Sequence, residues 1–203
     1  MDLIISAIAQ GMLWGLLSLG LFISFRVLNI ADMTTEGAYP LGAGVCVICI
    51  HNGVNPVLAT VIAIVAGMLA GLVTGFLITI CKIPSLLAGI LTMTALLSVN
   101  LRIMGRPNLS LLNKETIFSK FQSLNLPTHY DTVLLGFILS VIIIGMMSLF
   151  FSTELGQSLI ATGDNVKMAT ALGISTKAMT ILGLMLANGI IALAGAILAQ
   201  NNG

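Results

Sequence analysis

The sequence has very little charge. Only 7% of its 203 residues are Asp, Glu, Lys or Arg, 58% are hydrophobic, and the mean hydropathy is +1.11. A soluble domain carries roughly 25% charged residues, so this composition cannot cover a surface that faces water. Lipid, in contrast, tolerates apolar side chains all round a helix. The net charge of +1 also gives no basic field that would attract nucleic acid. The composition therefore predicts an integral membrane protein.

The sequence also lacks the motifs of catalysis and of nucleotide binding. It contains no GxSxG, no HExxH and no phosphate-binding glycine loop. His51 and His129 have no Cys, His or carboxylate at metal-ligand spacing. The three cysteines, Cys46, Cys49 and Cys81, lie in or at the end of apolar runs, where cysteine serves as a small apolar residue. We expect no enzyme activity, metal, cofactor or disulfide, so ATP-driven transport would need an ATPase on another subunit.

Long apolar runs dominate what is present. A helix crosses the hydrocarbon core with about 20 apolar residues. Five runs meet this length, and they cover residues 3–25, 57–81, 83–101, 132–151 and 178–200. With the segment described next, we expect an all-α polytopic protein with about six transmembrane helices.

The second span is predicted to be irregular. The apolar run 37–50 is too short to cross a bilayer, and its extension back to Val27 brings in Asp32 and Glu36. Acids at membrane depth are costly and usually face a cavity or the bundle interior. Three glycines and Pro40 follow them and weaken a regular helix. We therefore expect a broken second span, buried among the other helices.

Glycines spaced by four residues predict close helix packing. Gly67, Gly71 and Gly75 form one smooth stripe along a single helix face, and Gly11 and Gly15 repeat the spacing in the first span. Such stripes let a neighbouring backbone approach closely. Packing within the chain is the favoured interpretation, and contact with a second copy is the alternative.

The connections fall on two sides of the membrane. One side would hold the N-terminus, residues 51–56 and the loop 102–131, and the other the turns at Arg26 and Lys82 and the loop 152–177. Orientation normally follows the Lys/Arg bias. Each side carries four such residues, so charge does not orient this protein: Arg102, Arg106, Lys114 and Lys120 stand against Arg26, Lys82, Lys167 and Lys177.

Both long loops contain a short amphipathic segment. In loop 152–177 we predict a helix capped by Asp164 and ended by a left-handed Gly173. This helix is either a rigid knob outside the membrane or a connector along its surface. In loop 102–131 the spacing of Ile117, Phe118, Phe121 and Leu124 is helical and favours a position on the membrane surface over a partner contact.

Two segments resemble one family. Residues 26–43, RVLNIADMTTEGAYPLGA, look like the start of the second span in bacterial ABC permeases of the branched-chain amino acid and ribose type. Residues 161–174, ATGDNVKMATALGI, resemble the cytoplasmic coupling motif of the same family. The two matches occur in the family's order and leave a suitable number of spans between them.

The resemblance implies that residues 1–203 form one transmembrane permease domain of a bacterial inner-membrane importer, with 152–177 in the cytoplasm and 102–131 outside. The implied partners are cytoplasmic ABC ATPase subunits, an extracytoplasmic solute-binding protein and a second permease subunit, often an identical copy. ATP binding would drive alternating access for a small, amino-acid-like solute. Family members have further helices after this point, so we expect the chain to lack a C-terminal part.

The resemblance also implies residue roles. The translocation pathway would involve Asn29, Asp32, Thr34, Thr35 and Glu36. Contact with the ATPase would involve Thr162, Gly163, Asp164, Asn165, Met168, Ala169 and Gly173. Two other functions remain open. One is a membrane-embedded substrate-binding subunit of a vitamin importer, and the other is an assembly protein without transport.

Overall fold

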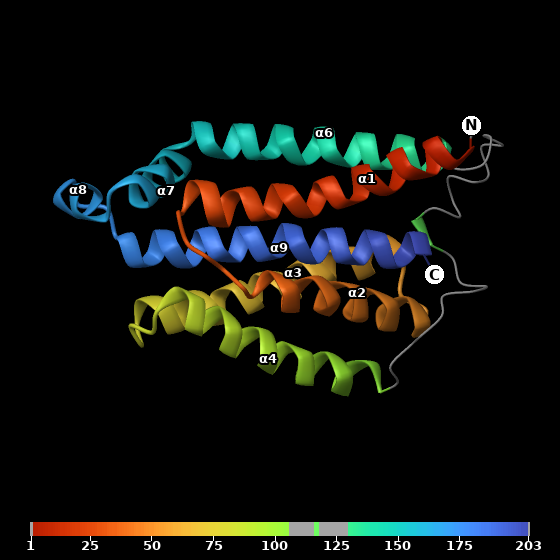
Figure 1. Ribbon diagram of the computed structural model, residues 1–203, viewed down its shortest axis with the longest axis horizontal. Helices are drawn as coiled ribbons and strands as arrows, with labels where there is room; N and C mark the ends of the chain where they lie inside the picture. The colour runs from red at the N-terminus through yellow and green to blue at the C-terminus, as the bar shows by residue number, and fades with distance from the viewer. Residues whose placement is uncertain (1, 106–115, 118–129, 203) are drawn as a thin grey trace.

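The computed structural model describes residues 2–105, 116–117 and 130–202, and this part of the chain is all helical. Long helices run side by side along one axis, and two short helices project at one end (Figure 1). The predicted all-α membrane fold is therefore confirmed. Most of the segment 106–129, including Phe118, Phe121 and Leu124, lies outside the described residues.

Five helices in the described part are long and apolar enough to cross a membrane. They are α1 (Asp2–Leu21, extended by the π-helix η1, Phe22–Val27), α3 (Pro56–Thr79), α4 (Ser85–Met104), α6 (Tyr130–Ser152) and α9 (Thr176–Asn202). The sixth, α2 (Thr35–His51), has 17 residues, the lower end of the roughly 17–25 that a span needs.

The connections divide between the two ends as predicted. The short helices α7 (Glu154–Asp164) and α8 (Val166–Ala171) lie at the end where α1 finishes, whereas the start of α1 and the end of α9 lie at the other (Figure 1). Local signals fix several helix ends. The Asn55 side chain accepts a hydrogen bond from the Val57 N–H at 3.2 Å, and Gly105 ends α4 in a left-handed conformation with φ +62°.

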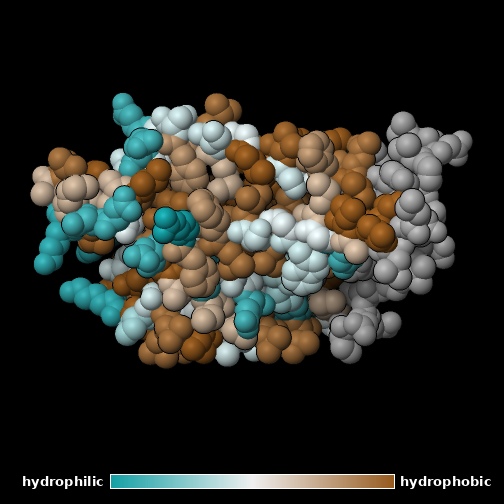
Figure 2. Space-filling model, turned by 45° about the horizontal axis from the view of Figure 1, so that its top comes forward, coloured by the Kyte–Doolittle hydropathy of each residue, from teal (hydrophilic) through white to brown (hydrophobic). Residues whose placement is uncertain are grey.

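Helix α9 is the centre of the bundle. Within its most apolar stretch 67% of residues are buried, against 17–33% in the other four long helices. It contacts α1, α2 and α3 (Figure 1). The outer helices leave large apolar side chains exposed, such as Leu69 and Phe76 of α3. Apolar residues accordingly cover much of the visible face, and hydrophilic ones gather toward the end with α7 and α8 (Figure 2). This is the surface of a protein surrounded by lipid.

Glycines bring neighbouring backbones against α9. Gly71 lies on the backbone of Leu184, and a Cβ on Gly75 would be 2.9 Å from the Cα of Ile181. Gly67 meets the next turn of α9 in the same way. In contrast, Cβ atoms on Gly11 and Gly15 would meet no atom within 4 Å, so in the described structure that pair packs on no neighbouring element.

Candidate functional site

The irregular backbone lies before α2 and not within it. Residues 28–34 have no regular helix and lead from η1 into the interior of the bundle, where α2 begins (Figure 1). Asn29 takes a left-handed φ of +55° in this linker. Helix α2 itself is continuous through Pro40. The predicted irregularity of the second span is therefore found at residues 28–34, ahead of α2. The glycines of α2 serve packing, since Gly42, for example, makes close contact with the backbone of Ala192 in α9.

Asp32 and Thr34 tie this linker to two helices, α9 and α3. Its side chain is fully buried, and one carboxylate oxygen accepts a hydrogen bond from the Thr34 N–H at 2.9 Å. The other oxygen accepts one from the Asn188 side-chain amide of α9 at 2.8 Å. The hydroxyls of Thr34 and Thr74 lie 2.8 Å apart and join the linker to α3. Such bonds offset the cost of burying a carboxylate at membrane depth.

A groove of about 760 Å³ lies beside the linker, between α1 with η1 and the first turn of α2. Its polar residues include Ser18 of α1 together with Asp32, Thr35 and Glu36. Asp32 and Thr35 are buried, and Glu36 is exposed. The rings of Trp14 and Tyr39 stack beside them, with centroids 5.8 Å apart and an interplanar angle of 20°.

The groove gathers three of the five residues assigned to the pathway. Asn29 is exposed on the linker and Thr34 is buried behind it, and neither lines the groove among the residues described. Sequence reasoning missed Trp14 and Asn188. Each carries a signal in hindsight, because Trp14 is the chain's single tryptophan and Asn188 is a polar residue in the middle of an apolar run.

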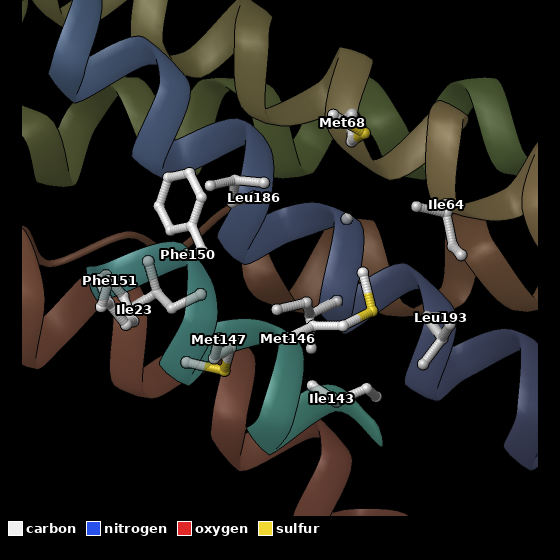
Figure 3. Close-up of a pocket in the computed structure, with 12 residues that line it drawn as sticks. Ile23, Ile64, Met68, Ile143, Met146, Met147, Phe150, Phe151, Leu186 and Leu193 are labelled. Carbon is white, nitrogen blue, oxygen red and sulfur yellow. The ribbon is translucent and has the colours of Figure 1, made fainter. Parts of the chain in front are cut away.

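A second crevice of about 290 Å³ is lined by apolar side chains alone among the residues described. Met146 of α6 extends toward Leu193 of α9, and Phe150 of α6 lies beside Leu186 of α9 (Figure 3). A polar solute finds no hydrogen-bond partner there, and its desolvation would not be compensated. The groove beside Asp32 is therefore the better candidate for solute contact.

Helices α7 and α8 form the segment assigned to coupling. The prediction that Asp164 caps the short helix that ends at Gly173 is wrong, because Asp164 is the last residue of the preceding helix α7. Asn165 is extended and caps α8, and its side chain accepts hydrogen bonds from the N–H groups of Lys167 and Met168 at 3.0 and 3.1 Å. Gly173 ends the segment with φ +82°, the predicted left-handed conformation.

The cap at Asn165 leads to a testable prediction for the stability of α8. Asn165→Ala should destabilise this helix by about 1 kcal/mol, because the N–H groups of Lys167 and Met168 lose their acceptor. Amide hydrogen exchange across Val166–Ala171 should become faster by about fivefold, the equivalent of that free energy. Asp164→Ala is the control and should leave this exchange nearly unchanged. Equal effects of the two variants would contradict the assignment of the cap.

Helix α7 rests on the start of the linker. Gly163 lies against the Val27 carbonyl, and a side chain there would collide with it. Leu159 packs with Leu28 in a buried cluster, and the Thr162 hydroxyl, also buried, donates to the Ser158 carbonyl at 2.7 Å. The surface of α8 is different, since Met168 and Leu172 are 48% and 69% exposed and only Ala169 is buried. Through α7, the segment therefore connects α8, which has exposed apolar side chains, to the linker that carries Asp32.

The chain is similar to known transport proteins. The family described as "Branched-chain amino acid transport system / permease component" matches residues 3–203. A tyrosine transport system permease protein of Clostridioides difficile is 39% identical over 97% of this chain and 64% of its own length. An uncharacterized protein of Rickettsia prowazekii is 38% identical over the whole chain and 70% of its own length.

A more distant relative is the autoinducer 2 import system permease protein of Yersinia enterocolitica, 28% identical over 79% of this chain and 44% of its own length. No solved structure is significantly similar. The chain thus spans less than two thirds of the tyrosine and autoinducer 2 permeases. The family nevertheless matches nearly every residue of this chain, and a membrane permease is consistent with the five helices that are long enough to cross a membrane. The chain belongs to the permease-component family of branched-chain amino acid transport systems and is a multi-pass inner-membrane protein.

Proposed function

We propose that this chain is the membrane-spanning part of an ATP-binding-cassette importer, and that it moves a small, amino-acid-like solute by alternating access. Family membership carries the proposal, and the two segments that resembled the family are the two joined by the contact of Gly163 with Val27. Hydrolysis of ATP is assigned to separate cytoplasmic subunits. A solute-binding protein would deliver the solute on the opposite side, and a second permease subunit would complete the pathway.

Helix α8 is the proposed contact with the ATPase. It is capped at Asn165, ended at Gly173, and exposes Val166, Met168 and Leu172 at an end of the bundle. An exposed apolar face on a helix suits a groove on a partner protein. Since α7 rests on Val27, a push on α8 would reach the linker that leads to Asp32. With this contact, residues 152–177 would lie in the cytoplasm.

The groove beside Asp32 is the proposed part of the solute pathway within this chain. It combines carboxyl groups at the linker and the start of α2 with an apolar wall on α1. The tyrosine permease is the amino-acid transporter among the relatives named above, at 39% identity, and it favours an amino acid as the solute. We assign contact with the solute to Thr35 and Glu36, and support of the linker to Asp32.

The test is capture of the ATPase. The natural protein, tagged and extracted in mild detergent, should retain ATPase subunits that mass spectrometry identifies. Changing Leu172 to Glu should reduce the recovered ATPase about tenfold or more, because a charge is placed in an apolar contact. Leu155→Glu is the matched control on α7, where the leucine is 52% exposed, and it should retain the partner. Failure of the parent protein to recover any ATPase would refute the proposal.

A further inference from the structure

We propose that the groove between α1 and the start of α2 binds solutes that carry a protonated amine on an apolar, preferably aromatic, body. The amine would lie at the Glu36 carboxylate and the body against Trp14 and Tyr39. This inference rests on the proposed transport function and adds the chemistry of the solute to it.

The charge in the groove has one sign. Its charged lining residues are Asp32 and Glu36, and no Lys, Arg or His lines it among the residues described. Both oxygens of Asp32 already accept hydrogen bonds from the Thr34 N–H and the Asn188 amide. Glu36 is exposed and is the second residue of α2, four residues after Asp32. Glu36 is therefore the carboxylate open to a solute, and it attracts a cation in the low dielectric of the membrane.

The opposite wall is aromatic. The sequence has 11 aromatic residues (8 Phe, 2 Tyr and 1 Trp), and four of them line this groove. Trp14, Phe22 and Phe25 are 45–49% exposed, and the Trp14 ring stacks on Tyr39. Aromatic faces bind both ammonium groups and flat apolar bodies. An acyl chain of a lipid would use this wall without needing Glu36, so dependence on the amine and on Glu36 separates a solute from lipid.

Trp14 provides the measurement, because it is the only tryptophan of the chain and lies in the groove. The 203-residue chain in lipid nanodiscs would be titrated while its tryptophan fluorescence is recorded. Phenethylamine and phenylalanine should each give a saturable change. The deaminated acid 3-phenylpropanoate, an anion with the same ring, should bind at least about tenfold more weakly than phenethylamine. Alanine, which lacks the apolar body, should also bind at least about tenfold more weakly than phenylalanine.

Glu36→Gln should weaken phenethylamine binding about tenfold and leave 3-phenylpropanoate unchanged or slightly tighter. The matched control is Glu154→Gln, an exposed carboxylate on α7 outside the groove, and it should bind as the parent does. Equal responses to the amine and to the acid would overturn the inference, as would a response that ignores Glu36 or the absence of any saturable change. The inference would also be overturned if the fluorescence change depended on the number of protein copies per nanodisc and not on the added solute. That result would assign the groove to contact with a second copy of the chain. The proposed transport function is tested separately by measuring whether the same variants still recover the ATPase in the capture experiment.

Discussion

Replacing Gly71 by leucine should prevent α3 from packing on α9 and cost about 3 kcal/mol of stability, the upper part of the range for overpacking. A Cβ at this position would already meet the Leu184 backbone and come within 2.8 Å of the Met185 Cα. The obstacle is backbone of the most buried helix, which cannot move aside as a flexible side chain does. Thermal unfolding in detergent, followed by circular dichroism, measures the loss.

Gly145→Leu is the matched control, because it makes the same change in α6 at an exposed glycine where a Cβ would meet no atom within 4 Å. Its stability should stay within about 0.5 kcal/mol of the parent, as for other surface substitutions. If the two variants unfolded at the same temperature, the close contact of α3 with α9 would be refuted.

Removing the Asp32 carboxylate should also have a large effect. In Asp32→Ala the Thr34 N–H and the Asn188 amide lose their acceptors, and each unsatisfied buried donor costs about 1–3 kcal/mol. We expect about 3 kcal/mol of destabilisation in total, together with loss of solute uptake, because the linker is no longer tied to α9. The readouts are thermal unfolding in detergent and uptake by cells that produce the complete transporter.

Two further variants separate support of the linker from contact with solute. Asp32→Asn should recover most of the stability, since Asn188 has a buried side-chain oxygen without a hydrogen-bond partner in the described structure, and that oxygen can accept from the new amide. Glu36→Ala, at an exposed carboxylate, should change stability by less than about 0.5 kcal/mol while it impairs uptake. Full stability of Asp32→Ala would remove the linking role of Asp32.

Most of the fold follows from local patterns. The five long apolar runs became five helices, and their ends differ from the predicted ones by a few residues because helix ends depend on caps as well as on hydropathy. The cap of α8 shows where prediction from local sequence patterns fails. Asp164 and Asn165 are both good capping residues, and the extended backbone of Asn165 in the folded chain selects the second.

The site depended on contacts between distant parts of the chain. Asp32 and Asn188 are 156 residues apart, so no spacing rule connects them. The same holds for the groove, which brings Trp14 of α1 to Glu36 of α2. From the sequence the two acids appeared alike, as buried charges of one irregular span. In the structure Asp32 holds the linker in place, whereas Glu36 stays open to the groove.

Membrane insertion, approximate helix lengths and family membership could all be predicted from the sequence. Hydropathy, helix length and short motifs are properties of neighbouring residues, and the surrounding lipid requires each span to satisfy its own backbone. The folded structure was needed to establish that α9 is the central helix, that the glycine stripe of α3 packs against it, and that Asp32 is buried whereas Glu36 is exposed. These features depend on which faces of the helices are in contact. Close packing between helices that are far apart in the chain determines those contacts.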